Sequence, residues 1–272
     1  RPAWSVTSVD PIARGTDAIY LADVETPDSA RTVVLKVAEF VDDERFLREP
    51  RTLSLVDEQT DIPVPSVLAV RASHDDLPAP FFLMEAVGGV DPVDGVLDDG
   101  MRARLAEDSG RALAAIHDAW AGEPEGFGWV DPREDTFAAV GEHDAWSDHY
   151  RSMTIEDGIE HFDGGRFADR APALCERVET LAETLPDAEP VVRHNDWRPG
   201  NLRVDPETGG LVAALDWGAV AVGHDEYELA AVEEFLTDRA PLDDPLRERV
   251  RRALRDGYTD RRALPSGEDA ER

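Results

Sequence analysis

The stretch "HNDWRPGN", residues 194–201, carries side chains whose types and spacing suit phosphoryl-transfer chemistry. His194, Asp196 and Asn201 form the pattern H-x-D-x-x-x-x-N, and Asp216 follows after a turn-rich segment. A carboxylate on such a loop can orient an attacking hydroxyl and accept its proton. An amide oxygen one short turn later, with a second carboxylate, can ligate Mg²⁺, because phosphate oxygens and water supply the remaining ligands. A solvated surface turn is the alternative, but the returning strand that ends in Asp216 favours a catalytic loop.

Composition sets apart this loop and one other position. Asn195 and Asn201 are the only asparagines, and Lys36 is the only lysine among 28 lysines and arginines. Lys36 lies in "VVLKVA", an apolar run typical of a strand. An ammonium is a compact point charge on a flexible stem, whereas a guanidinium is a planar fork. We therefore expect Lys36 to contact the α- and β-phosphates of a nucleotide, with a solvated edge-strand lysine as the alternative.

The elements around Lys36 are mostly strands. Short β-branched or aromatic runs between turn residues predict strands at 18–24, 31–40, 67–73 and 80–86. The segment 43–58 has helical periodicity, and Pro50 predicts that this helix either begins near the proline or kinks there.

The pattern becomes helical after residue 88. Helices are predicted at 100–120 and 172–185, and two more within 225–264, separated by a proline-containing break at 241–245. The segments "NLRV", "DPETGG" and "LVAALDW" predict a hairpin just after the catalytic loop. We therefore predict an α+β protein of two lobes. Residues 1–87 would form a small antiparallel-sheet N-lobe, and residues 88–272 a larger helical C-lobe.

These motifs, in this order, resemble the aminoglycoside phosphotransferase and choline kinase family, small-molecule kinases that share the protein-kinase fold. "HNDWRPGNLRVD" resembles the catalytic loop of that family, and "LVAALDWGAVAVGHDEYELA" resembles its metal-binding segment and following helix. "VVLKVA", "FLREPRTLSLV" and "PFFLMEAVGG" are similar to its lysine strand, the next helix and the hinge. The resemblance covers roughly residues 12 to 235 and implies a bilobal protein-kinase-like fold.

The resemblance implies roles for the residues of the catalytic loop. Asp196 would be the catalytic base, and Asn201 and Asp216 would hold Mg²⁺. Arg198, two residues after the base, would meet the γ-phosphate. An ion pair with a nearby acid is the alternative for Arg198.

The resemblance also implies how the nucleotide, ATP, is bound. Lys36 would hold its phosphates and Glu49 would position Lys36, with Glu44 as the alternative partner because Pro50 restricts the backbone beside Glu49.

Two further segments would complete the nucleotide site. Backbone groups around Glu85 and Val87 would pair with adenine. Gly15 and Thr16, in "ARGTDAIY", would either cover the phosphates or form a simple turn.

The chain departs from the family pattern at three positions. Asn195 stands where the family usually has glycine, Trp197 where it has leucine, and Glu228 where it has aspartate. We expect Trp197 to fill the core behind the loop. The sequence offers no reason for Asn195.

The chain is strongly acidic. It has 59 Asp and Glu against 28 Lys and Arg, a net charge of −31 and a pI near 4.4. Such a surface with almost no lysine predicts a halophilic source, where salt screens the self-repulsion, and a cation-binding surface is the alternative. The charge disfavours nucleic acid and anionic membranes as partners.

A single cysteine, Cys175, excludes an internal disulfide. We expect a cytoplasmic protein.

Together these features predict an ATP- and Mg²⁺-dependent phosphotransferase that moves the γ-phosphoryl group to a hydroxyl of a small molecule. Asp225 and Glu226 near the site would suit a cationic acceptor: an aminoglycoside, an amino sugar, or a choline-like or related alcohol. A nucleotide-binding pseudokinase or regulatory module without turnover is the alternative. The sequence does not decide ATP against GTP, the acceptor's identity, or the oligomeric state.

Overall fold

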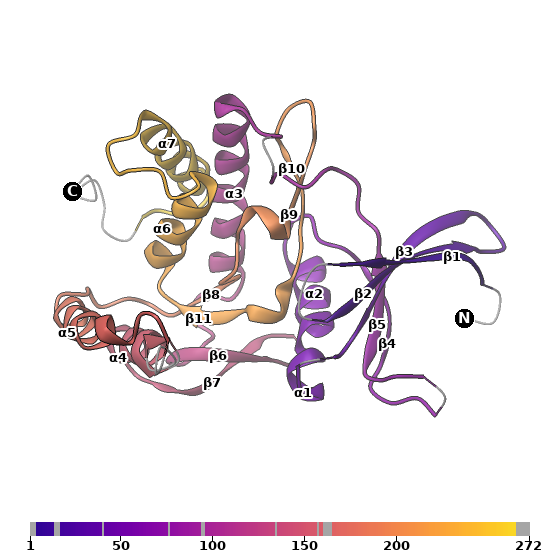
Figure 1. Ribbon diagram of the computed structural model, residues 1–272, viewed down its shortest axis with the longest axis horizontal. Coiled ribbons are helices and arrows are strands. Elements are labelled where there is room, and N and C mark those ends of the chain that lie inside the picture. The colour runs from indigo at the N-terminus through magenta and orange to yellow at the C-terminus, as the bar shows by residue number, and fades with distance from the viewer. Residues whose placement is uncertain are drawn as a thin grey trace.

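The computed structural model describes residues 4–13, 17–39, 41–75, 77–93, 96–133, 135–156, 158–159 and 165–264. Figure 1 shows two lobes, one built around the N-terminal sheet and a larger one that contains most of the helices. Among the described residues, no helix has both the length and the apolar character needed to cross a bilayer.

The N-terminal sheet has five antiparallel strands in the order β1-β2-β3-β5-β4. The strands are β1 (Ser5–Ile12), β2 (Ala18–Glu25), β3 (Ala30–Val37), β4 (Val67–Arg71) and β5 (Phe81–Glu85). Lys36 lies on the central strand β3, opposite Ile19 of β2 and Phe82 of β5. The sheet therefore presents Lys36 from its middle, not from an edge.

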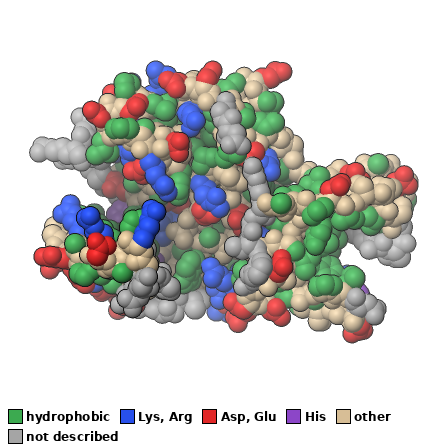
Figure 2. Space-filling view, in the orientation of Figure 1, with side chains coloured by type: hydrophobic (Ala, Val, Ile, Leu, Met, Phe, Trp, Pro, Cys, Tyr) green, Lys and Arg blue, Asp and Glu red, His purple; other side chains and the backbone are tan. Residues whose placement is uncertain are grey.

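The first strand was not predicted from the sequence. β1 is an edge strand, and its apolar residues Val6 and Val9 are exposed, so it lacks the alternating burial that marks a strand. Figure 2 shows hydrophobic side chains gathered over this part of the molecule.

The predicted helix at 43–58 is divided into two. α1 (Asp43–Phe46) is capped by the Asp42 carboxylate, and α2 (Arg48–Gln59) begins two residues before Pro50. Proline is tolerated there because the first turn of a helix has no intrahelical donors to lose. The same turn carries Glu49, which is buried.

The remaining helices form the larger lobe. They are α3 (Asp99–Ala119), α4 (Trp146–Arg151), α5 (Ala171–Ala182), α6 (Asp225–Leu236) and α7 (Pro245–Thr259). Short 3-10 or π turns are η1 (Ser152–Glu156), η3 (Ala168–Arg170), η4 (Pro199–Asn201) and η5 (Trp217–Ala219). The predicted helices at 100–120 and 172–185 correspond to α3 and α5, and the two predicted in 225–264 to α6 and α7.

Two small sheets lie in the larger lobe. The hairpin β9 (Leu202–Val204) and β10 (Leu211–Ala214) follows the catalytic loop, as predicted. A four-stranded antiparallel sheet contains β7 (Phe137–His143), β6 (Phe127–Pro132), β11 (Ala221–Gly223) and β8 (Val191–Arg193). β6 and β7 fall in a polar stretch with no predicted element, because glycine and proline interrupt their short apolar pattern.

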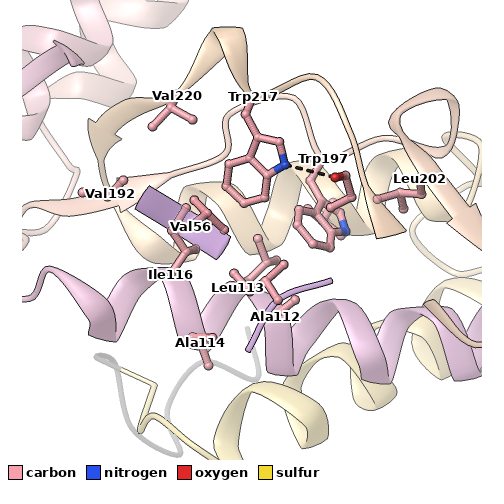
Figure 3. Close-up of a cluster of buried hydrophobic side chains, with 14 of the residues drawn as sticks. Val56, Ala112, Leu113, Ala114, Ile116, Val192, Trp197, Leu202, Trp217 and Val220 are labelled. Atoms are coloured by element: carbon pink, nitrogen blue, oxygen red, sulfur yellow. Dashed lines mark hydrogen bonds between the residues drawn. The ribbon is translucent and has the colours of Figure 1, made fainter. Parts of the chain in front are cut away.

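The core behind the catalytic loop is built around two tryptophans and α3 (Figure 3). Trp197 and Trp217 are fully buried, and both indole N–H groups have partners. Trp197 donates to Ser109 Oγ at 2.9 Å and Trp217 to the Ala214 carbonyl at 3.1 Å. Trp197 therefore fills the core behind the loop, as expected from the sequence, without leaving a polar atom unsatisfied.

Helices α3 and α7 cross at two glycines. A Cβ on Gly110 would lie 2.1 Å from the Leu254 carbonyl oxygen, and one on Gly257 would lie 1.9 Å from that of Glu107. The two helix backbones are therefore in direct contact, which no larger residue at either position would permit.

We predict that Gly110→Ala destabilises the protein although alanine is the better helix former by about 1 kcal/mol. The clash with the α7 backbone should lower the free energy of unfolding by about 2 kcal/mol net. Urea unfolding of Gly110→Ala and of Gly88→Ala measures the difference; a Cβ at Gly88 has no atom within 4 Å. Equal stability of the two variants would contradict this account of the crossing.

Candidate functional site

A cleft of about 740 Å³ lies between the two lobes. Apolar residues of the N-terminal sheet, such as Ile19, Val34 and Met84, line one wall. The opposite wall includes the loop at 198–201 and Asp216. The lysine strand and the catalytic loop are thus brought to one cleft.

Lys36 is held by three carboxylates. Its Nζ lies 2.6 Å from Glu49 Oε2, 3.4 Å from Asp216 Oδ1 and 3.6 Å from Asp17 Oδ2. Glu44, the alternative partner, is exposed on α1. Of the two candidates, Glu49 is therefore the partner of Lys36, and the first turn of α2 directs it toward β3.

The electrostatics of this cluster favour a further cation. Burial alone would lower the pKa of Lys36, but the charges of Glu49 and Asp216 outweigh burial and raise the pKa above its ordinary value. Lys36 thus stays protonated at neutral pH. Three carboxylates around one ammonium leave an excess of negative charge, which suits a bound metal ion.

Asp196 is oriented by its neighbours in the loop. Asn201 Nδ2 donates to Asp196 Oδ2 at 2.7 Å and to the Asp196 carbonyl at 3.0 Å. Arg198 Nε donates to both carboxylate oxygens, at 2.8 and 3.0 Å. Arg198 lines the cleft, but its guanidinium forms an ion pair with Asp196. An ion pair with a nearby acid was the alternative interpretation of Arg198. Its contact with a γ-phosphate stays a prediction.

Asn201 and Asp216 offer donors of the right chemistry for Mg²⁺. The amide nitrogen of Asn201 faces Asp196, so the amide oxygen points away from that carboxylate. Asp216 has a left-handed backbone with φ 61° and a half-exposed carboxylate. A neutral amide oxygen and a carboxylate are hard oxygen donors, which fit Mg²⁺. Within the described ranges no group of three or more His, Cys, Asp or Glu is placed to hold a metal ion.

The backbone at Asn195 explains a departure from the family pattern. Asn195 has φ 67°, in the left-handed region that favours glycine. Asparagine tolerates this region better than other side chains because its short polar group can bond locally. Asn195 thus replaces glycine at a position that needs a left-handed residue, a requirement that the sequence alone did not reveal.

His194 ties the loop to the segment that carries Asp216. Burial lowers the pKa of His194, so its ring is neutral at pH 7. Nδ1 accepts the Asp196 N–H at 3.2 Å, and Nε2 therefore donates to the Leu215 carbonyl at 3.0 Å. These bonds connect the backbone at Asp196 to the residue before Asp216.

Glu228 anchors the loop from the opposite side. Its Oε1 accepts the Asn195 N–H at 2.7 Å, and its Oε2 lies 2.8 Å from His117 Nε2. His117 Nδ1 in turn lies 2.8 Å from the Tyr258 hydroxyl. Glu228, His117 and Tyr258 are all buried. Glu228 on α6 therefore links the loop to α3 and α7, which is a structural use for the longer carboxylate.

The expected adenine-binding segment also lines the cleft. Glu85 and Val87 both contribute to its wall. The Glu85 N–H donates to the Ser66 carbonyl at 3.0 Å, so this N–H is already paired and is not free to bond a base. Gly15 and Thr16 lie outside the described residues.

Three residues of the cleft region were not predicted from the sequence. Asp17 is the third carboxylate on Lys36. Arg203 Nη1 and Asp91 Oδ2, both on the wall of the cleft, lie 3.6 Å apart. Arg203 lies in the predicted strand "NLRV", and the alternation of side chains along that strand could have predicted which face it points to. Asp91 lies in a loop, where no sequence pattern predicts the direction of a side chain.

The sequence and the fold are similar to those of known proteins. The sequence matches the phosphotransferase enzyme family over residues 9–265. It is 23% identical over 191 residues to the Arabidopsis thaliana protein named probable acyl-CoA dehydrogenase IBR3. That match covers 67% of this chain and 22% of the plant protein, so the chain spans about a fifth of that relative.

Two solved structures have the same fold. A candidate aminoglycoside phosphotransferase from Ralstonia eutropha JMP134 superposes with a TM-score of 0.66 at 18% identity, over 94% of this chain and 74% of that one. A thermostable aminoglycoside phosphotransferase mutant in ternary complex with ADP and hygromycin B gives 0.62 at 16% identity, over 93% and 84%. The bilobal α+β protein-kinase-like fold is confirmed.

The left-handed backbone at residue 195 predicts a specific tolerance. Asn195→Gly should fold with unchanged or higher stability, whereas Asn195→Val should lower the free energy of unfolding by about 1–2 kcal/mol. Chemical denaturation of both variants measures this, with the glycine variant as control for loss of the side chain. Equal stability of the two variants would exclude the left-handed requirement.

Proposed function

The chain belongs to the phosphotransferase enzyme family, and on that premise we propose that it transfers the γ-phosphoryl group of ATP to a hydroxyl group of a small molecule with the aid of Mg²⁺. The observation that carries the proposal is the convergence of Lys36, Asn201 and Asp216 on one cleft, with Asp196 hydrogen-bonded to Asn201 beside it. ADP bound to a structural neighbour supports a nucleotide as donor.

The proposed reaction uses Asp196 as general base. Its carboxylate accepts the proton of the acceptor hydroxyl while the hydroxyl oxygen bonds to the γ-phosphorus. The bond from the γ-phosphorus to the β–γ bridging oxygen breaks, and ADP leaves. Asn201 holds the carboxylate of Asp196 in place through the hydrogen bond described above.

Charge on the phosphates is balanced by Lys36 and by the metal. Lys36, fixed by Glu49, would contact the α- and β-phosphates. Asn201 and Asp216 would hold Mg²⁺, which when bound neutralises charge on the transferred phosphoryl group. Arg198 would exchange Asp196 for the γ-phosphate when ATP binds. Glu85 and Val87 would face the adenine.

The lobes would divide at residue 87, with residues 1–87 binding the nucleotide and residues 88–272 supplying the catalytic loop, metal ligands and acceptor pocket. Val90 supports this boundary, because its N–H donates to the Val204 carbonyl at 2.8 Å and so joins the hairpin of the larger lobe. The acidic surface supports a cytoplasm of high salt as the protein's environment.

We predict that Asp196→Asn lowers kcat about 100- to 10,000-fold, because an amide cannot accept the proton. ATP affinity should change by less than about threefold, since Asp196 does not line the cleft wall. Coupled ADP release with a panel of hydroxylated compounds, and calorimetry with Mg-ATP, measure the two effects.

The matched control is Asp187→Asn, which changes an exposed loop carboxylate. Full activity of Asp196→Asn would remove that residue from the role of base. Tight Mg-ATP binding by the wild type without turnover of any acceptor would instead favour a nucleotide-binding regulatory module.

The acidic composition predicts stabilisation by salt. Raising KCl from about 0.1 M to 1 M shortens the Debye length from about 10 to 3 Å, so repulsion between carboxylates falls and Tm should rise. A variant with five exposed acids neutralised should respond less: Glu58→Gln, Asp75→Asn, Glu125→Gln, Glu183→Gln and Glu189→Gln. A Tm that is independent of KCl in the wild type would contradict the halophilic interpretation.

A further inference from the structure

A second cavity, of about 430 Å³, adjoins the catalytic loop. Asn195 lines it, and the next residue is Asp196. Residues 198–201 of the same loop line the nucleotide cleft instead. The loop that carries Asp196 thus has the nucleotide cleft on one side and this second cavity on the other.

Arg193 is a buried cation on the wall of this cavity. It ends β8, and its side chain is 1% exposed. Its Nε and Nη2 have no hydrogen-bond partner in the described part of the chain. The rings of Trp146 and Tyr227 each lie 5.4 Å from its guanidinium carbon. An isolated charge in such a place is costly, and aromatic faces offset only part of that cost.

The fold makes room for this guanidinium. A Cβ on Gly223 would lie 2.0 Å from Arg193 Nε and 2.5 Å from Nη2. The strand next to β8 therefore has a glycine at the one position where a side chain would displace the charge. The placement of Arg193 is built into the packing and is not a chance surface rotamer.

The described residues on the cavity side of Arg193 include no acids. None of the described lining residues is Asp or Glu, although the chain contains 59 of them. Glu228 attracts Arg193 through its charge, but its two oxygens are already bonded to Asn195 and His117. His149 also lines the cavity, and burial, with Arg193 and His143, lowers its pKa to about 4, so it is neutral at pH 7.

The acids that would suit a cationic acceptor lie elsewhere. Asp225 is 3% exposed and bonded to His224 Nδ1 at 3.0 Å. Neither Asp225 nor Glu226 lines the nucleotide cleft or the second cavity. These two residues therefore do not favour an amino sugar or a choline-like alcohol as the acceptor.

We propose that the second cavity binds a carboxylate group of the acceptor against Arg193, so that the acceptor is a small hydroxy acid. This inference rests on the proposed function above. Arg193 and Asp196 are three residues apart, which limits their Cα separation to about 11 Å. One small molecule can therefore present its carboxylate to the first and its hydroxyl to the second. Thr154 and the exposed ring of Trp129 offer a polar contact and an apolar wall for its carbon chain.

Three four-carbon alcohols test the charge preference: 4-hydroxybutyrate, 1,4-butanediol and 4-amino-1-butanol, each with Mg-ATP at fixed KCl. We expect kcat/KM for the hydroxy acid to exceed that of the other two by about tenfold or more. Preference for the amine or the diol would overturn the proposal.

Direct binding separates this inference from the proposed function. Butyrate lacks a hydroxyl and cannot be phosphorylated, but it should raise Tm and compete with the hydroxy acid, whereas butylammonium should do neither. Butyrate binding without turnover of any alcohol would contradict the proposed function but support the carboxylate site. Absence of a butyrate effect at tens of millimolar would overturn the site itself.

Two variants test whether the carboxylate of butyrate binds at Arg193 in the second cavity. Arg193→Met should weaken butyrate binding about 10- to 100-fold with ATP affinity unchanged, and Arg252→Met, an exposed arginine on α7, should have no effect. Thr154→Trp keeps Arg193 and fills the cavity, so it should abolish butyrate binding even if Arg193→Met fails to fold. Wild-type butyrate affinity in Thr154→Trp would overturn the assignment.

Discussion

The site depends on one buried carboxylate, that of Glu228. It accepts the N–H of Asn195, a residue whose left-handed backbone turns the chain out of β8 and into the catalytic loop. It also bonds His117, and through it Tyr258, so α3, α6 and α7 fix the loop together. Burial would raise the pKa of Glu228, but the bonds from His117 and the charge of Arg193 lower it, so the anchor stays ionised. A charged acceptor bonds a backbone N–H more strongly than a neutral one.

The anchored loop separates two cavities of opposite electrostatic character. On the side of the proposed nucleotide site, Glu49, Asp216 and Asp17 surround one lysine, an arrangement that would suit phosphates accompanied by a metal ion. On the other side, Arg193 is buried beside a cavity without acidic residues among those described. Asp196 lies on the loop between Asn195, which lines the second cavity, and Arg198, which lines the nucleotide cleft. A donor that arrives with its own cation and an acceptor that arrives as an anion would each meet complementary charge.

How much the sequence could predict follows from how local each signal is. The strands around Lys36, the hairpin after Asn201 and helices α3 and α5–α7 have clear periodicity or turn chemistry, and the structure contains them. β1, β6 and β7 were missed because exposed apolar residues, glycine and proline remove their pattern. Gly223 and Arg193 gave no signal at all, because their relation exists only once β8 and β11 pair. Long-range packing of this kind cannot be read from one sequence.

The three residues that the composition disfavours persist for three different reasons. Asn195 occupies a left-handed backbone position, which few other side chains tolerate. Asn201 donates from its amide nitrogen to Asp196, and an aspartate there could not donate and would repel the base. Lys36 is buried with its ammonium 2.6 Å from Glu49, and a planar guanidinium fork would not meet that carboxylate as a compact ammonium does. The preference for acids and arginine therefore extends over most of this chain, but not to positions that need a left-handed backbone, an amide donor or a compact cation.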